Sequence, residues 1–98
     1  MKRLNAILTL ALLAGPAAAA DGKTVYDNIC YKCHRTGTDD APRTGNKADW
    51  APRLAQGTAA LYKNVAEGKG AMDPRAGKPE LSDAELKAGV DYLVGMVK

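Results

Sequence analysis

The chain has 98 residues, with 14 basic side chains, 11 acidic side chains and one histidine, which gives a formal net charge of +3. Basic residues are interspersed with acidic ones rather than clustered, so the charge pattern excludes a nucleic-acid-binding protein. The length fits one domain. With one Trp and no Phe, such a short chain builds only a marginal core of its own, which favours a large apolar cofactor.

Residues 1–20 have the organisation of a secretory signal peptide. A basic start precedes an apolar run over 6–14, and Ala18–Ala20 forms an A-x-A cleavage site before Asp21. The apolar run is too short to span a bilayer as a helix, and an uncleaved anchor is the alternative. We therefore expect one mature domain, 21–98, without a membrane span, exported to a bacterial periplasm.

The first predicted helix runs from Lys23 to His34 and ends in the segment Cys-Tyr-Lys-Cys-His. Positions i, i+3 and i+4 of a helix share one face, so Cys30, Cys33 and His34 can face one flat ligand. C-x-x-C-H is the attachment sequence of c-type haem. The segment therefore predicts one haem c, bound covalently through both thiols, with the imidazole on the iron.

The cysteine pair could instead belong to a zinc site, a redox dithiol or a structural disulfide. A structural zinc site needs four ligands, and the chain has no further Cys or His, so a carboxylate would have to complete it. A thioredoxin-like dithiol needs a βαβ context, and no strand-like run is present. A disulfide between Cys30 and Cys33 would close a very small loop and stabilise little. Haem remains the leading interpretation.

The middle of the chain is predicted to form a loop over 40–46 and a short helix over 47–56. Trp50 and Leu54 lie four residues apart, on one face of this helix. Pro52 is tolerable only near the first turn of a helix, because it cannot donate a backbone hydrogen bond.

A further helix is predicted from Thr58, as its N-cap, to about Glu67, with Gly68 after its end. Gly68 to Glu80 then reads as an irregular loop, because it contains three glycines and two prolines. No strand is predicted anywhere, so the fold class is all-α.

The last predicted helix begins with the sequence Ser82-Asp83-Ala84-Glu85, which is a capping box, and runs to Val97. We expect its apolar stripe to form core against the first helix. The residues of this stripe are Leu86, Val90, Leu93, Val94 and Val97.

The second axial position of the iron decides the function, and no second histidine can fill it. Of the three methionines, Met1 leaves with the signal peptide. Met96 lies near the end of the last helix, and its side chain is predicted to have only a packing role. Met72 lies in the glycine-rich loop, so it is the candidate ligand, with a gap-filling role as the alternative.

Together these features resemble the small bacterial class I cytochromes c, specifically the cytochrome c5-like group. The resemblance covers nearly all of 22–97. It implies about four helices around one covalently bound haem, with the first and last helices crossing. The residues that carry it are the haem motif 30–34, Ala41-Pro42, Trp50 with Arg53, Gly68-x-Gly70-x-Met72, and Leu81-Ser82-Asp83.

The resemblance also implies roles for individual residues. Met72 would be the sixth iron ligand, and the Pro42 carbonyl would accept a hydrogen bond from the outer nitrogen of His34. Trp50 and Arg53 would lie near the haem propionates. Trp50 is then both core and haem wall, and Arg53 has a solvated surface charge as its alternative role.

The chain departs from this family at two points in the methionine loop. The family usually has proline after its methionine, whereas this chain has Asp73 and then Pro74. The extra cysteine pair of some c5 proteins is absent. We therefore expect the rigidity of the loop to come from Pro74, Pro79 and packing against haem.

Histidine and methionine ligation predicts a periplasmic one-electron carrier rather than an enzyme, because a six-coordinate iron has no position for substrate. Its partners would be larger redox proteins that dock transiently, and it would be a monomer. One alternative is a five-coordinate haem protein that binds small gases or decomposes peroxide. Another is a dedicated haem subunit of a larger redox enzyme.

Overall fold

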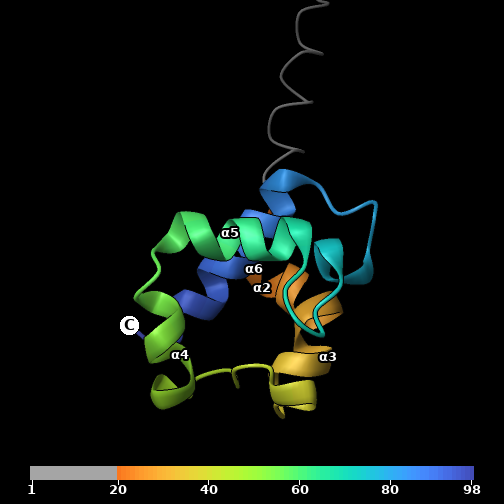
Figure 1. The fold of residues 1–98 in the computed structure, drawn as a ribbon. Helices are drawn as coiled ribbons and strands as arrows, with labels where there is room; N and C mark the ends of the chain where they lie inside the picture. The colour runs from red at the N-terminus through yellow and green to blue at the C-terminus, as the bar shows by residue number, and fades with distance from the viewer. Residues whose placement is uncertain (1–19) are drawn as a thin grey trace, which may run out of the picture.

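The computed structural model describes residues 20–98, so the predicted signal peptide lies outside the described residues except for Ala20. Within that range the chain forms helices joined by turns and loops, with one isolated bridge and no strand (Figure 1). The all-α prediction is confirmed for this part of the chain. None of its helices is both long and apolar enough to cross a membrane.

The first predicted helix is continuous over 22–34 but is not uniform. It consists of α2 (Gly22–Val25), a π-helical turn η2 (Tyr26–Cys30) and α3 (Tyr31–His34). Tyr26, in the π turn, is buried together with Val25. Single π turns inside α-helices occur frequently at functional sites, and this one ends at the first cysteine of the motif.

Helix α4 (Lys47–Leu54) begins at Asn46, whose side-chain oxygen accepts a hydrogen bond from the Asp49 backbone nitrogen at 2.9 Å. The prediction that Pro52 is tolerated only near the first turn of this helix is wrong, since Pro52 is the sixth residue of α4. A proline there removes one backbone hydrogen bond. The helix ends two residues later, so few of its backbone hydrogen bonds are affected. Trp50 is 5% exposed and belongs to the core.

Helix α5 (Thr58–Glu67) lies between two glycines. Its N-cap is Gly57 rather than Thr58, which corrects the predicted cap. Gly57 has a φ of 90° and Gly68, at the other end, has a φ of 91°. Only glycine adopts such angles readily, so these two residues set both ends of α5.

The loop after α5 is more regular than expected. Lys69 and Met72 exchange two backbone hydrogen bonds, each 2.9 Å long, which close a tight turn. A 3₁₀ turn, η4 (Pro74–Gly77), follows. The expectation that only Pro74, Pro79 and haem packing stiffen this loop is therefore wrong, because the Lys69–Met72 pair fixes the backbone beside the methionine.

Helix α6 (Asp83–Gly95) begins with the predicted capping box. The Glu85 backbone nitrogen donates to the Ser82 hydroxyl at 3.1 Å, and the Ser82 nitrogen donates to the Glu85 carboxylate at 2.9 Å. The helix ends at Gly95, two residues before the predicted end. Met96 is 48% exposed, so its predicted packing role is wrong.

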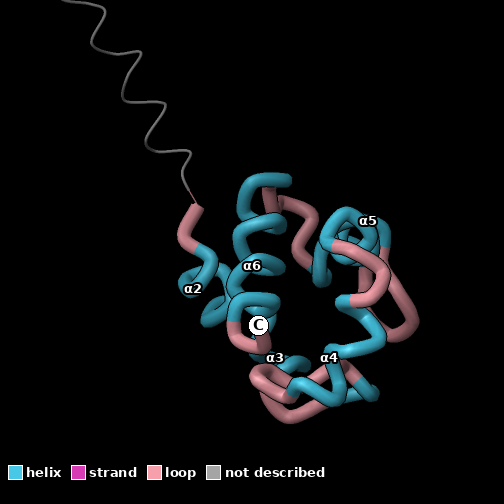
Figure 2. The backbone as a smooth tube through the Cα atoms, turned by 90° about the vertical axis from the view of Figure 1, so that its left-hand side faces the viewer, coloured by secondary structure: helices cyan, strands magenta, loops and turns pink. Residues whose placement is uncertain are grey.

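Helices α2 and α6 lie against each other in both Figure 1 and Figure 2, which confirms the predicted pairing of the first and last helices. Gly22 leaves no room for a side chain against the Ala88 carbonyl, and a Cβ atom on Gly89 would lie 3.0 Å from Val25 Cγ1. Two glycines thus allow the helices to approach closely. The buried core comprises Val25, Tyr26, Trp50, Leu61, Leu81, Leu86, Val90, Leu93, Val94 and Val97.

Candidate functional site

The two cysteines of the motif are free thiols on the helix that ends at His34. Cys30 is half-buried against α6, where a Cβ atom on Gly89 would lie 3.4 Å from its sulfur, and Cys33 is exposed. Burial raises the pKa of the Cys30 thiol to about 11. Zinc and redox dithiol sites both need a stabilised thiolate. This environment instead suits uncharged sulfur, as in a thioether.

The His34 imidazole is oriented by the loop that follows α3. Its Nδ1 donates a hydrogen bond to the Pro42 carbonyl at 2.8 Å, the contact that the resemblance implies. Burial lowers the pKa of His34, although this hydrogen bond opposes the shift. A neutral imidazole with its proton on Nδ1 leaves the lone pair of Nε2 for a metal ion.

The same loop is fixed from α4. The Trp50 indole Nε1 donates to the Arg43 carbonyl at 2.8 Å. The Arg43 guanidinium donates to both oxygens of Asp49, at 2.7 and 3.2 Å, and holds the pKa of that carboxyl down at about 2. These contacts anchor the residue next to Pro42, so the acceptor for His34 is held in place.

Trp50 and Arg53 both lie beside the histidine. The Trp50 and His34 rings are stacked, with centroids 5.7 Å apart. The Arg53 guanidinium donates to the Asp49 carbonyl at 2.7 Å, and its charge contributes to the lowered pKa of His34. Each of the two side chains therefore donates one hydrogen bond to a main-chain carbonyl. Their placement beside haem propionates stays a prediction.

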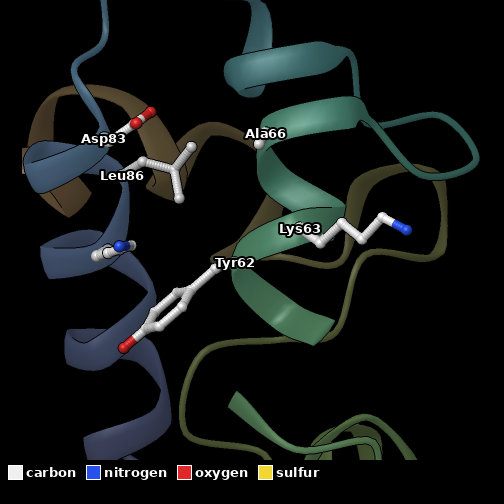
Figure 3. Close-up of a pocket in the computed structure, with 6 residues that line it drawn as sticks. Tyr62, Lys63, Ala66, Asp83 and Leu86 are labelled. Atoms are coloured by element: carbon white, nitrogen blue, oxygen red, sulfur yellow. The ribbon is translucent and has the colours of Figure 1, made fainter. Parts of the chain in front are cut away.

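A polar hollow of about 350 Å³ lies on the Pro42 side of the histidine, where Arg43, Asp49 and Arg53 contribute to its walls. A second hollow, of about 180 Å³, lies between α5 and α6 (Figure 3). There Tyr62 and Leu86 project into the space between the helices, and Lys63 points away from it. The second hollow includes none of the predicted site residues, so it is separate from the motif.

Met72 lies in the tight turn that leaves α5, and its side chain is half-buried. In Figure 1 this turn extends from the end of α5 towards the level of α3. A Cβ atom on Gly68 would lie 3.0 Å from the Met72 carbonyl oxygen, so the turn packs tightly on the end of α5. The structure thus fixes the Met72 backbone, and its role as iron ligand stays a prediction.

The residues present fit a covalently attached haem. A neutral imidazole with a fixed outer nitrogen, one half-buried thiol and one exposed thiol occupy a single helix end. No large side chain among the described residues is less than 2% exposed. A flat apolar group beside Trp50 would add the buried surface that a core of this size needs.

Two interactions of the site are not evident from the sequence. Arg43 pairs with Asp49 across six residues, and the Tyr26 hydroxyl lies 2.8 Å from the Thr44 hydroxyl across eighteen. The first joins a loop residue to the first turn of α4, at a spacing that no helical periodicity indicates. The second joins positions with no periodic relation, so no local pattern indicates it.

Comparisons with known proteins agree on one family. The family described as cytochrome c oxidase, cbb3-type, subunit III matches residues 17–93. Cytochrome c-555 of Chlorobaculum thiosulfatiphilum is 43% identical over 84 residues, which cover 82% of this chain and 98% of that protein. Cytochrome c5 of Azotobacter vinelandii is 34% identical over 80 residues, which cover 80% of this chain and 96% of that one.

Solved structures give the same result. A cytochrome c from an electron transfer complex with nitrite reductase has a TM-score of 0.74 and 43% identity, over 79% of this chain and 94% of that one. A mono-haem ferrocytochrome c from Shewanella putrefaciens has a TM-score of 0.67 and 36% identity, over 80% of this chain and 95% of that one. This chain is therefore similar to these proteins in both fold and sequence.

Proposed function

The chain belongs to the small class I cytochromes c of the c5-like group, and on that premise we propose that His34 and Met72 bind its haem iron. It carries a covalently attached haem and acts as an electron carrier. Cys30 and Cys33 form the two thioethers. When bound, the haem supplies an iron that takes up and releases one electron.

The hydrogen bond from His34 Nδ1 to the Pro42 carbonyl carries the proposal. It selects the tautomer whose Nε2 can bind iron, and it fixes the plane of the ring. Met72 would supply a soft, neutral thioether to the iron, which favours ferrous iron and raises the reduction potential. With both positions filled by side chains, the protein is a carrier rather than an enzyme.

The alternative of a dedicated haem subunit draws support from the matched family, whose description names an oxidase subunit. Two of the relatives support a separate carrier. This chain spans 98% of cytochrome c-555 and 96% of cytochrome c5, and neither name refers to a complex. We therefore favour a separate, monomeric carrier over a subunit.

The electron-transfer partners are proposed to be larger redox proteins in the periplasm. A related cytochrome is solved in complex with nitrite reductase, which gives the class of partner. Transient redox contacts of this kind bury less than about 1,200 Å². The signal-like segment 1–20 supports export.

Optical spectroscopy of the ferric haem protein tests the ligand assignment. We expect the weak far-red band from sulfur-to-iron charge transfer in the unmutated protein and in Met96→Leu, and its loss in Met72→Ala. Met96 is the matched control because it is exposed and lies outside the turn. A band that survives Met72→Ala would contradict Met72 as ligand. Carbon monoxide binding by the unmutated ferrous protein would favour the five-coordinate alternative.

A further inference from the structure

The hydroxyl of Tyr26 is a buried polar group that is not needed to bind or attach the haem. Tyr26 lies in the π turn, is 9% exposed, and packs its ring on Tyr92 with centroids 5.3 Å apart. Its oxygen lies 2.8 Å from Thr44 Oγ1. A phenylalanine ring would pack equally well against Tyr92, so packing does not explain why this position has a hydroxyl with a hydrogen-bond partner.

The direction of this hydrogen bond follows from proton counting. Thr44 Oγ1 donates its single hydrogen to the His34 carbonyl oxygen at 3.3 Å. A threonine hydroxyl has one hydrogen and two lone pairs. Tyr26 must therefore donate to Thr44, and the chain of donors runs from Tyr26 through Thr44 to the backbone of His34.

His34 is thus held at two points by one short loop. Its carbonyl accepts from the Thr44 backbone nitrogen at 2.7 Å as well as from the Thr44 hydroxyl. Its imidazole Nδ1 donates to the carbonyl of Pro42, which lies two residues before Thr44 in the chain. Only Arg43 separates Pro42 from Thr44, so Thr44 acts on the position of the Pro42 carbonyl together with the contacts that Trp50 and Asp49 make to Arg43.

We propose that the Tyr26 hydroxyl is a positioning group for the redox centre. Through Thr44 it fixes the Pro42 carbonyl, and so keeps the hydrogen bond at His34 Nδ1 short and the imidazole basic. A more basic imidazole stabilises ferric iron, so this contact lowers the reduction potential. The inference rests on the proposed role of His34 as iron ligand.

The test uses the haem-loaded protein and four variants: Tyr26→Phe, Thr44→Val, the double variant of these two, and Tyr92→Phe as control. Tyr26→Phe keeps the ring that packs in the core. Tyr92→Phe removes a hydroxyl from the other ring of the same pair, outside the donor chain. Three quantities are measured: the reduction potential, the exchange rate of the His34 Nδ1 proton by NMR in the ferrous state, and the stability to urea.

Tyr26→Phe is expected to raise the reduction potential and to make the Nδ1 proton exchange about five- to tenfold faster, the equivalent of one ordinary hydrogen bond. Thr44→Val should shift both quantities in the same direction. The double variant should add little to Thr44→Val, because both changes break one chain. Tyr92→Phe should change neither quantity.

A merely structural hydroxyl would give a different result. Tyr26→Phe would then lower the stability to urea but leave the potential and the proton exchange unchanged, and the inference would be overturned. Additive effects in the double variant would also contradict it. If the unmutated protein shows no imidazole resonance shifted by haem, the assignment of His34 as ligand fails instead.

Discussion

At the scale of single residues, Gly57 and Gly68 are a natural pair for comparison. Gly57 has φ and ψ of 90° and 155°, and Gly68 has 91° and 154°. This conformation is almost restricted to glycine, and another residue there costs about 1–3 kcal/mol. Their surroundings differ. A Cβ atom on Gly57 would meet nothing within 4 Å, whereas one on Gly68 would press on Met72 and Pro74.

We therefore expect Gly57→Ala and Gly68→Ala to share the backbone strain, with a loss of stability of about 1–3 kcal/mol in urea unfolding. Only Gly68→Ala should also displace the turn that carries Met72. Its ferric protein should show a weakened far-red sulfur-to-iron band, and that of Gly57→Ala should be unchanged. Equal spectra for the two variants would show that the turn does not depend on close packing at Gly68.

The residues of the haem motif could be predicted because their spacing is itself the signal. Cys30, Cys33 and His34 are adjacent on one helix end, and helical geometry brings them to one face. The Tyr26–Thr44 contact could not be predicted in this way. It depends on the path of the loop between α3 and α4, which no periodicity describes.

At the scale of elements, the helix caps show which local signals the fold uses. The capping box of Ser82 and Glu85 forms both of its hydrogen bonds. Thr58 has the right residue type for a cap, but Gly57 occupies that position and makes no side-chain cap. The competing factor is the positive φ at Gly57, which turns the chain from α4 into α5 and carries Thr58 inside the helix.

Two alanine substitutions test this difference. Ser82→Ala is expected to destabilise the protein by about 1 kcal/mol, because it leaves a backbone donor of α6 without its cap. Thr58→Ala should change the stability by less than about 0.5 kcal/mol, as for surface positions without special contacts. Urea unfolding of the haem protein measures both. A cost at Thr58 equal to that at Ser82 would indicate a capping role that the structure does not contain.

The π turn is the element that sequence periodicity missed. Helical spacing places residues i and i+4 on one face, and that rule led to a uniform helix from Lys23 to His34. In the structure, Val25 and Cys30, five residues apart, both lie close to Gly89 of α6. The extra residue in the turn allows this. It is favoured by contact with α6, which a local pattern does not contain.

At the scale of the whole molecule, the packing indicates how far the polypeptide alone specifies the fold. In residues 20–98 the core consists of two clusters, one around Leu86 and Val90 and one around Trp50 and Leu93, and Cys30 packs on both. A haem attached at this cysteine would therefore contact the junction of the two clusters. Such a group would extend the buried surface of both clusters, which otherwise meet only through partly buried side chains such as Cys30 and Leu54.

Loss of haem is therefore expected to cost most of the folded structure. The variant with both Cys30→Ser and Cys33→Ser cannot form thioethers, while serine nearly preserves the size of each side chain. We expect it to show much reduced helicity by circular dichroism and no cooperative thermal transition, because a single domain of this length has a marginal core. The haem-loaded protein should unfold cooperatively and recover its spectrum on cooling. A cooperative transition in the double variant near that of the haem protein would show that α2, α5 and α6 form a sufficient core without the cofactor.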